Sequence, residues 1–250
     1  MTDNFYDKVA KKFGGYGYST SPQYTKEFPG DDPEKVFKEK ILELSSKDKI
    51  TLDIGCADGK FTLSVAPFFQ KVYGIDISKV NLDIAVSHLN EEASKNVEYS
   101  LQDASKTSFP DSFFDLAYCR RGPSYYKEYY RILKTNGYYL EIGIGEKDAI
   151  ELKKIFGRGQ DYGKWDKPKL DEKISNLQKL GFKILFAENY NFLEYYPSCE
   201  ELERFLLGVP IFEDFDPEKD KPYLNKYVTE YKSEKGIKLP RHRVVLVVQK

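Results

Sequence analysis

The feature that most constrains the fold of this chain is a regular alternation of short apolar runs and helical patterns from residue 50 to residue 145. The apolar runs are rich in the β-branched and aromatic residues that strands favour, and they are 50–55, 71–77, 97–103, 114–120 and 138–145. Strands that are joined by helices run parallel and need cover on both faces. The pattern therefore predicts an α/β fold with a doubly wound, mostly parallel sheet and helices on both faces.

The rest of the chain extends this sheet. Two more strand-like runs, 182–192 and 241–250, complete a predicted sheet of seven strands whose last strand is antiparallel. Helical patterns cover 33–44, 60–69, 79–94, 123–133 and 169–180, with short helices near 5–13 and 199–207, and Asn136-Gly137 is expected to end the helix over 123–133. We expect an N-terminal lid segment at 1–33 and a cofactor-binding core at 34–196. An insert near the substrate side is expected at 197–241, and the final core strand at 242–250.

Composition excludes several classes of protein. With 40% hydrophobic and 32% charged residues among 250, the chain is predicted to be globular rather than disordered. The formal net charge of −1 disfavours a large nucleic-acid footprint. No apolar run approaches the roughly 20 residues of a membrane span, and the first residues lack a secretion pattern, so we expect a cytoplasmic protein without a membrane partner. Three scattered cysteines and two histidines offer no metal-ligand spacing, so no metal site is expected.

The first predicted strand ends in the sequence DIGCADG, in which the small residues Gly55, Ala57 and Gly59 alternate with larger ones. At the carboxyl end of such a strand, small residues let a ligand lie against backbone amides. The spacing differs from the G-x-G-x-x-G that binds a dinucleotide pyrophosphate. Asp53 precedes the loop, which suits a ligand with a positive charge and no pyrophosphate. Asp76, at the end of the second strand, can accept both hydroxyls of a ribose.

Four ordered motifs within 50–145 resemble those of the class I, Rossmann-like S-adenosylmethionine-dependent methyltransferases, in particular the methyltransferase-11-like branch. The loop resembles the first motif of this family, although Ala57 stands where glycine is usual. The stretches 101–119 and 129–143 resemble later motifs, with Thr135-Asn136-Gly137 in place of Pro-Gly-Gly. The resemblance implies S-adenosylmethionine as cofactor and S-adenosylhomocysteine as product. It also implies a set of cofactor-binding residues: Asp53, Gly55, Cys56, Ala57, Gly59, Asp76, Ile77, Asp103, Ala104 and Cys119.

The substrate side is predicted to begin where the fourth strand ends, at Cys119, Arg120 and Arg121. This place lacks the Asn/Asp-Pro-Pro-Tyr/Phe motif of enzymes that methylate nucleic-acid amines. The two arginines suit a carboxylate or phosphate on the substrate, or the carboxylate of the cofactor, and the alternative is an ion pair with a surface acid. Cys119 has no histidine near it in sequence, which favours an ordinary strand residue over a nucleophile.

Two more segments carry candidates. The glycine- and tyrosine-rich N-terminal segment could close over the pocket as a lid, with Tyr16, Tyr18 and Tyr24 as lid residues, or it could be a packing tail. His242 lies in a basic turn near a plausible pocket mouth, where it is a structural histidine or a base. The candidate catalytic residues are therefore Arg120, Arg121, Tyr16 and His242.

The leading functional hypothesis is methyl transfer by in-line displacement to an acceptor that we expect to be a small molecule. In such a reaction the protein mainly aligns the reacting atoms, and a general base is needed only if the acceptor is protonated. An RNA- or nucleotide-modifying methyltransferase is the alternative. An NAD-dependent oxidoreductase is disfavoured because G-x-G-x-x-G is missing, and a catalytically silent cofactor-binding protein is the last alternative.

Overall fold

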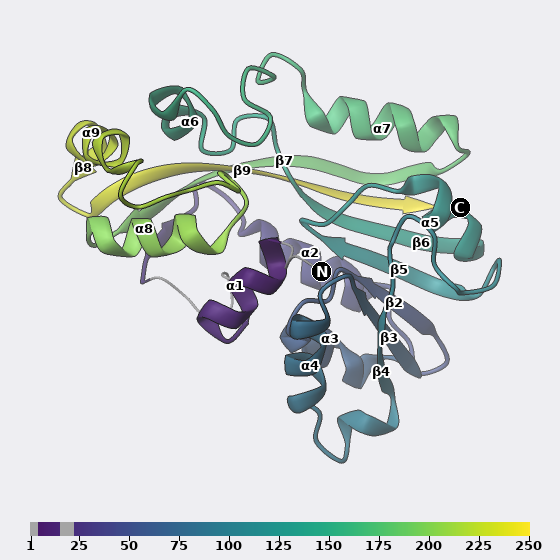
Figure 1. Cartoon of the computed structure of the whole chain (residues 1–250). Coiled ribbons are helices and arrows are strands. Elements are labelled where there is room, and N and C mark those ends of the chain that lie inside the picture. Colours follow the sequence, from purple (N-terminus) through teal and green to yellow (C-terminus); the bar gives the residue numbers. More distant parts are fainter. Residues whose placement is uncertain (1–4, 16–22) are drawn as a thin grey trace. The chain divides into compact units, whose positions relative to one another are not determined.

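The computed structural model describes residues 5–15 and 23–250 (Figure 1). The chain divides into two compact units. The large unit consists of Asp32–Gly143, Lys169–Asn189 and Val244–Lys250. The small unit consists of Met1–Asp31, Ile144–Pro168 and Tyr190–Arg243.

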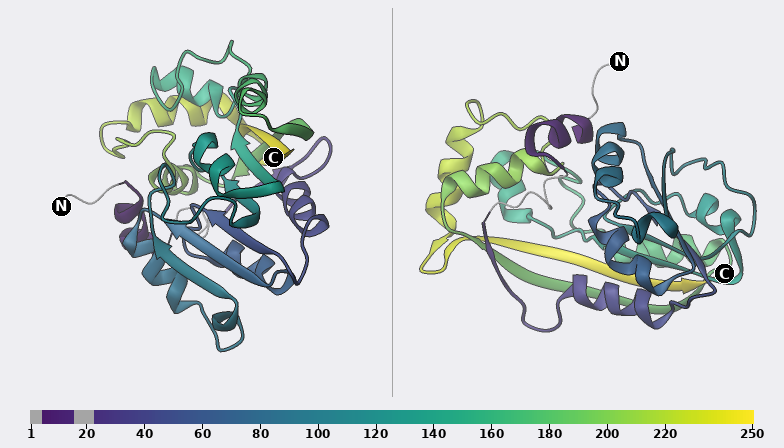
Figure 2. Two further views of the ribbon diagram at one scale, coloured as in Figure 1. Left: turned by 90° about the vertical axis from the view of Figure 1, so that its right-hand side faces the viewer. Right: turned by 90° about the horizontal axis from the view of Figure 1, so that it is seen from below.

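The large unit contains the predicted sheet. Its strands are β2 (Ile50–Ile54), β3 (Lys71–Asp76), β4 (Val97–Leu101), β5 (Phe114–Arg120) and β6 (Leu133–Ile144), with parts of β7 (Lys183–Tyr196) and β9 (Gly236–Gln249). Among the described residues of this unit they lie in the order β7-β9-β6-β5-β2-β3-β4. The pairs β2–β3, β2–β5, β3–β4 and β5–β6 are parallel. Strands β7 and β9 run side by side (Figure 2).

The last strand runs against its neighbour. The Asn136 amide, near the start of β6, donates to the carbonyl of Lys250, which follows β9. The Gly145 amide, just after β6, donates to the carbonyl of His242, in the middle of β9. The partner in β9 therefore moves back toward the start of β9 as β6 runs forward, so β9 is antiparallel to β6. The prediction of a mostly parallel seven-stranded sheet with an antiparallel last strand is confirmed.

Helices cover both faces of the sheet because strand side chains alternate between them. On one face, Tyr118 of β5 packs against Phe37 of α2 (Pro33–Glu43) and Phe61 of α3 (Lys60–Val65), with ring centroids 6.4 Å and 5.7 Å apart. On the other face, Tyr139 of β6 packs against Tyr129 of α5 (Tyr126–Ile132) at 5.0 Å. The predicted helix over 169–180 forms α7 (Lys169–Lys179), which buries Leu170 and Leu177 in the same core.

Two predicted helix ends are wrong. The helix expected over 79–94 is α4 (Lys79–Ser87), which Ser78 caps as predicted by accepting the Asn81 amide, and His88 ends it. The helix expected to stop at Asn136-Gly137 stops earlier, because β6 already begins at Leu133. Asn136 has φ +64°, and a Cβ on Gly137 would lie 2.9 Å from a carbonyl oxygen. These two residues therefore form an irregular site inside a strand rather than a helix terminus.

The small unit holds most segments that the sequence patterns left undefined. It contains α1 (Phe5–Phe13) and α8 (Cys199–Gly208), both as predicted. It also contains elements that were not predicted: β1 (Thr25–Glu27), α6 (Ile150–Phe156), α9 (Lys221–Tyr231) and β8 (Lys232–Ser233). Strand β1 pairs with the end of β7, and β8 pairs with the start of β9. Both long strands extend beyond their apolar runs: β7 reaches Tyr196, next to the expected insert, and β9 begins inside that insert at Gly236.

Candidate functional site

The loop between β2 and α3 carries the alternating small residues. Gly55, Ala57 and Gly59 have φ angles of +72°, +49° and +73°. A Cβ on Gly59 would lie 2.3 Å from the hydroxyl of Tyr99, whereas a Cβ on Gly55 would meet open space. Gly59 is therefore required for packing against β4. Gly55 is required by its own backbone conformation, and it leaves the surface beside it open.

Asp53 lies inside the large unit. Its carboxylate is 2% exposed and accepts a hydrogen bond from the Thr62 hydroxyl of α3 at 2.6 Å. Burial raises the pKa of Asp53 to about 6, although the Thr62 hydroxyl and the positive charge of Arg120 oppose the shift. Asp53 thus joins β2 to the helix that follows the loop. A contact between Asp53 and a cofactor stays a prediction.

Asp53 should make the protein less stable as the pH rises from about 4 to about 6. A carboxyl whose folded pKa exceeds its unfolded value of about 3.9 binds its proton more tightly in the folded state, so stability falls across that window. In the wild type, the Asp53 carboxyl should make the free energy of unfolding about 2–3 kcal/mol lower at pH 7 than at pH 4. The Asp53→Asn variant should lack this contribution, as measured by urea unfolding at the two pH values. Asp103→Asn is the matched variant, because a hydrogen bond from Ser105 lowers the pKa of Asp103 and reverses the sign. An unchanged pH dependence in Asp53→Asn would contradict the assignment.

Asp76 lies half-buried at the end of β3, next to the small-residue loop. One carboxylate oxygen accepts the Ala57 amide at 3.0 Å, and the other accepts the Ser78 amide at 2.8 Å. The next residue, Ile77, is 52% exposed. Asp76 therefore fixes the loop and sits beside an exposed apolar side chain.

The end of β4 also has an exposed apolar side chain close to a carboxylate. Leu101 pairs in register with Asp76 and is 58% exposed. Asp103 is exposed two residues later, while Ala104 is buried. An adenosine has two apolar ring faces and needs acceptors for its hydroxyl and amino hydrogens, which matches apolar side chains placed between carboxylates. The residues at these two strand ends therefore fit the adenosine part of S-adenosylmethionine.

The two cysteines near the loop ends are buried. Cys56 is 6% exposed and Cys119 is fully buried. Burial raises the pKa of both thiols above the usual range, so each is a neutral thiol at physiological pH. The Cys119 thiol donates weakly to the Pro123 carbonyl at 3.8 Å. This environment favours the interpretation of Cys119 as an ordinary strand residue.

Arg120 and Arg121 both bind Glu34, which lies in the first turn of α2. Arg120 Nη2 is 3.2 Å from one oxygen of Glu34, and Arg121 Nη1 is hydrogen-bonded to the other oxygen. The Arg120 guanidinium also stacks on the Phe61 ring, 4.1 Å from its centroid. The structure thus has the ion pair that was the alternative for these arginines. Glu34 was missed, because an acid in the first turn of a helix is ordinarily explained by the helix dipole.

A buried polar network supports the loop that follows β5. Glu141 of β6 is 1% exposed and accepts hydrogen bonds from Lys173 at 2.6 Å and from the Tyr126 hydroxyl at 2.9 Å. Lys173 also donates to Ser124 at 3.1 Å, and the Tyr129 hydroxyl donates to the Pro123 carbonyl at 2.9 Å. The network ties the loop to α5, β6 and α7. Sequence patterns do not indicate it, because its members come from separate elements.

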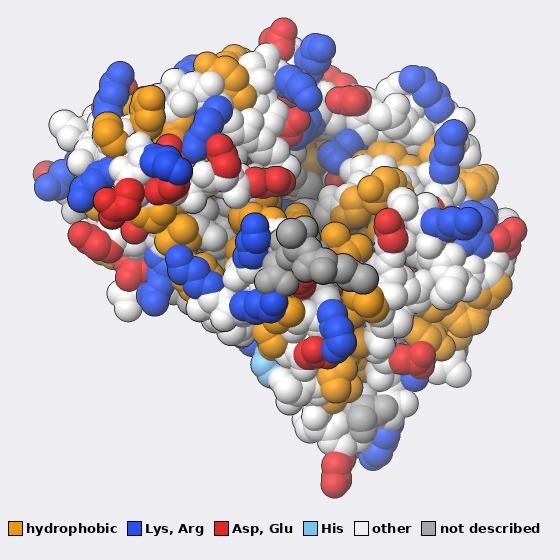
Figure 3. Space-filling view, viewed as in Figure 1, with side chains coloured by type: hydrophobic (Ala, Val, Ile, Leu, Met, Phe, Trp, Pro, Cys, Tyr) orange, Lys and Arg blue, Asp and Glu red, His pale blue; other side chains and the backbone are white. Residues whose placement is uncertain are grey.

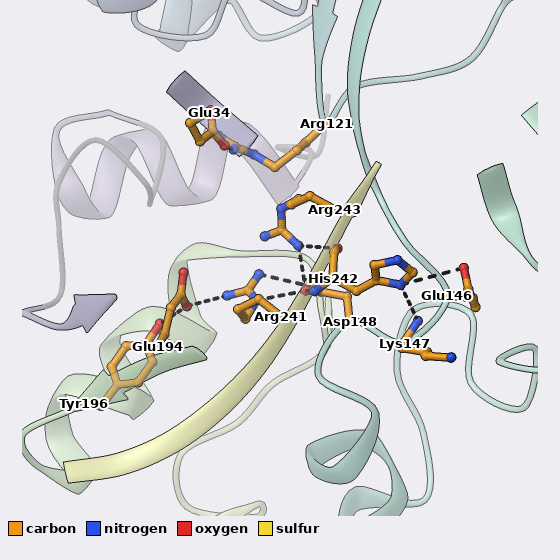
Figure 4. Close-up of polar contacts among 10 residues, drawn as sticks. All are labelled: Glu34, Arg121, Glu146, Lys147, Asp148, Glu194, Tyr196, Arg241, His242 and Arg243. Atoms are coloured by element: carbon orange, nitrogen blue, oxygen red, sulfur yellow. Dashed lines mark hydrogen bonds and ion pairs between the residues drawn. The ribbon is translucent and has the colours of Figure 1, made fainter. Parts of the chain in front are cut away.

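The small unit contains the other charged cluster, drawn in Figure 4. Arg241 is fully buried and binds Asp148 at 2.9 Å and Glu194 at 2.7 Å, while Arg243 binds Asp148 at 2.6 Å. His242 is 3% exposed, and its Nδ1 accepts the Lys147 amide at 3.2 Å. Burial lowers the pKa of His242, which keeps the imidazole neutral. The geometry favours a structural histidine, and a catalytic role for His242 stays a prediction.

Of the lid tyrosines, Tyr16 and Tyr18 lie outside the described residues. Tyr24 stacks on Tyr196 of β7, with ring centroids 5.3 Å apart. This contact belongs to the small unit. A lid role for the segment stays a prediction.

The fold and the loops at the ends of β2 to β5 define a Rossmann-like methyltransferase core. Residues 51–137 match the model of a family described as a methyltransferase domain. This segment is therefore a methyltransferase domain, and it has the Rossmann-like fold of the class I S-adenosylmethionine-dependent methyltransferases.

Curated relatives and solved structures agree with this assignment. An uncharacterised methyltransferase of Bacillus subtilis, YcgJ, is 27% identical over 162 residues, which cover 59% of this chain and 56% of YcgJ. A demethylmenaquinone methyltransferase of a Geobacillus species is 25% identical over 177 residues, 58% of this chain and 76% of that protein. The crystal structure of YcgJ has the same fold, with a TM-score of 0.62 at 16% identity over 86% of this chain and 97% of YcgJ. The matched sequence spans little more than half of YcgJ.

The described residues also bear on the predictions that concern a membrane span and a metal site. Among the helices of residues 5–15 and 23–250, none is long and apolar enough to cross a membrane. The same residues contain no group of three or more His, Cys, Asp or Glu side chains that could hold a metal ion.

Proposed function

We propose that this protein transfers the methyl group of S-adenosylmethionine to a small-molecule acceptor by in-line displacement. The observation that carries the proposal is the pair of carboxylates at adjacent strand ends, Asp76 and Asp103, with the exposed side chains of Ile77 and Leu101 beside them. These groups would bind the adenosine, and the open loop at Gly55 would lie against the rest of the cofactor. The bound cofactor would supply the activated methyl group.

Three observations support a small acceptor over a nucleic acid. The net charge is −1, and on the face in Figure 3 basic and acidic side chains are interspersed. From the last residue of β5 onward the sequence is Arg-Arg-Gly-Pro-Ser, without an acceptor motif for a nucleobase amine. One relative is named for methylating demethylmenaquinone, which is a small molecule.

The chain itself would mainly position the acceptor. In-line displacement needs the nucleophile, the methyl carbon and the sulfur to be aligned, and a rigid loop beside the methyl group serves this purpose. The hydrogen bonds that anchor Pro123 and Ser124 to α5 and α7 would provide that rigidity. The buried, neutral thiol of Cys119 does not act as a nucleophile in this proposal.

The Asp76→Ala variant should bind S-adenosylmethionine at least tenfold more weakly, about 1.4 kcal/mol, because it loses the acceptor for the ribose hydroxyls. Isothermal titration calorimetry with S-adenosylmethionine, S-adenosylhomocysteine and NAD would measure this loss. Asp83→Ala is the control, since Asp83 is exposed on the nearby helix α4 and forms an ion pair with Lys79. Unchanged affinity in Asp76→Ala, or wild-type binding of NAD instead, would contradict the proposed site.

The acceptor class is tested by methyl transfer from radiolabelled S-adenosylmethionine to a small-molecule fraction and to an RNA fraction of a cell extract. We expect label in the small-molecule fraction. Label in RNA, with binding that weakens steeply as salt rises, would instead favour the nucleotide-modifying alternative.

A further inference from the structure

Two arginines from one strand end converge on a single carboxylate in the large unit. Glu34 is held in place by the start of α2, where Asp32 accepts its backbone amide at 2.9 Å. Its two carboxylate oxygens are divided between Arg120 and Arg121 (Figure 4 shows Glu34 with Arg121). The exposed fractions of the three side chains are 25% for Glu34, 27% for Arg120 and 10% for Arg121. The two arginines thus form a partly desolvated binding site for a carboxylate, and the side chain of Glu34 occupies it.

The site lies next to the small-residue loop. Ile54 and Cys119 are register partners in the parallel strands β2 and β5, so Gly55 and Arg120 follow at the same level. The Arg120 guanidinium stacks on Phe61, which lies in the first turn of the helix after the loop. The positive charge of Arg120 also acts on buried Asp53. These three relations place Arg120 beside the small-residue loop and the open surface at Gly55.

Arg120 also has donor capacity that this contact does not use. Its Nε is buried and has no acceptor within the described residues. A guanidinium binds a carboxylate best through two parallel hydrogen bonds, whereas Arg120 binds Glu34 through a single hydrogen bond, from Nη2. A carboxylate that approached Arg120 from the side of the loop could engage Nε together with a second guanidinium nitrogen.

We propose that Arg120 and Arg121 form a binding site for the carboxylate of the amino-acid end of S-adenosylmethionine, and that Glu34 competes with this carboxylate for the same donors. The inference rests on the proposed function. In that proposal Asp76 and Asp103 bind the adenosine, and the two arginines now give the amino-acid end of the cofactor its own binding residues. A carboxylate that binds Arg120 through Nε and Nη2 takes the Nη2 donor that Glu34 uses, so cofactor and Glu34 compete, and the observed affinity is the intrinsic affinity reduced by this competition.

The experiment compares two ligands that differ at the amino-acid end. S-adenosylhomocysteine carries the carboxylate, and 5′-methylthioadenosine keeps the adenosine and the thioether but lacks it. Calorimetry would measure both dissociation constants for the wild type, Glu34→Gln and Arg120→Met, since methionine retains an apolar side chain over Phe61. Glu39→Gln is the matched control, because Glu39 is exposed on the same helix and its ion pair is with Lys35. Thermal unfolding of each variant would verify that it is folded.

We expect Glu34→Gln to bind S-adenosylhomocysteine at least threefold more tightly than the wild type, and Arg120→Met to bind it at least tenfold more weakly. The affinity for 5′-methylthioadenosine should change less than twofold in both variants, and Glu39→Gln should resemble the wild type. If both ligands bind but their affinity ratio is the same in all variants, the inference is overturned while the proposed function stands. If neither ligand binds to any variant, the proposed function falls, and the inference falls with it.

Discussion

Replacing Asp148 with alanine is expected to lower the free energy of unfolding by about 3–5 kcal/mol. Asp148 accepts hydrogen bonds from two buried guanidinium groups, those of Arg241 at 2.9 Å and Arg243 at 2.6 Å, and from the backbone amide of His242 at 3.0 Å. Its removal takes away the carboxylate that these two buried cations share, while the ion pair of Arg241 with Glu194 remains. Breaking a buried ion pair is far more costly than losing an exposed one, because the remaining charge stays desolvated.

The effect should also depend on pH. Burial by itself raises the pKa of Asp148, but the charges of Arg241 and Arg243 outweigh burial and hold its pKa well below the usual range. A depressed folded pKa contributes stability that is present above the unfolded value of about 3.9 and is lost as the pH falls through the folded value. The difference between wild type and Asp148→Ala in urea unfolding should therefore be full at pH 7 and shrink in strong acid.

The matched control for this prediction is Asp214→Ala. Asp214 is 74% exposed and lies 3.5 Å from Arg158, in the same unit. Its removal should change the free energy of unfolding by less than about 1 kcal/mol. If Asp148→Ala were no more destabilised than Asp214→Ala, the buried cluster would not be the stabilising feature that its geometry indicates.

Replacing Lys173 with methionine is expected to destabilise the large unit by about 3 kcal/mol. Lys173 is the cation for buried Glu141, with 2.6 Å between Nζ and Oε1. Burial alone lowers the pKa of Lys173, but the Glu141 carboxylate outweighs it and raises the pKa, so the lysine is charged. Methionine fills similar space without the charge. It leaves the buried Glu141 carboxylate with the neutral hydroxyl donors of Tyr126 and Tyr139 in place of a cation.

A double variant separates charge from packing. In Lys173→Met/Glu141→Gln the buried charge is gone, and most of the lost stability should return, as measured by urea unfolding. Glu141→Gln alone should be destabilised, because it leaves the Lys173 ammonium without its anion. If the double variant were as unstable as the sum of the two single variants, the two side chains would act independently, contrary to the contact between them.

Local patterns predicted the parts of the chain that repeat. Each of the seven apolar runs became a strand, and the small residues at Gly55 and Gly59 lie in the loop where they were expected, with the positive φ angles that glycine tolerates. Asp76 and Asp103 follow adjacent strands for the same reason, because parallel strands present their carboxyl ends at one edge of the sheet.

Patterns failed where the chain does not repeat. The segment from Val209 to Leu239 is rich in proline and charge, and neither a strand nor a helix period stands out in it, yet it folds into α9 and the pair of strands around Gly236. Burial of Leu224, Tyr227 and Leu239 in one cluster stabilises these elements. Such packing overrides weak local preference, and only the folded chain shows it.

The sequence by itself determined the alternation of strands and helices in the large unit, the class of the fold and the edge of the sheet where the small-residue loop and Asp76 lie. These follow from periodicity and from turn residues, which act over a few positions. The tertiary structure alone decided the partners of the buried charges. Arg120 binds Glu34 across 86 residues of sequence, and Arg241 binds Asp148 across 93. The periodicity of a sequence does not indicate which charged residues pair. The partners are the side chains that the fold brings together away from water, because an unpaired buried ion is very costly in free energy.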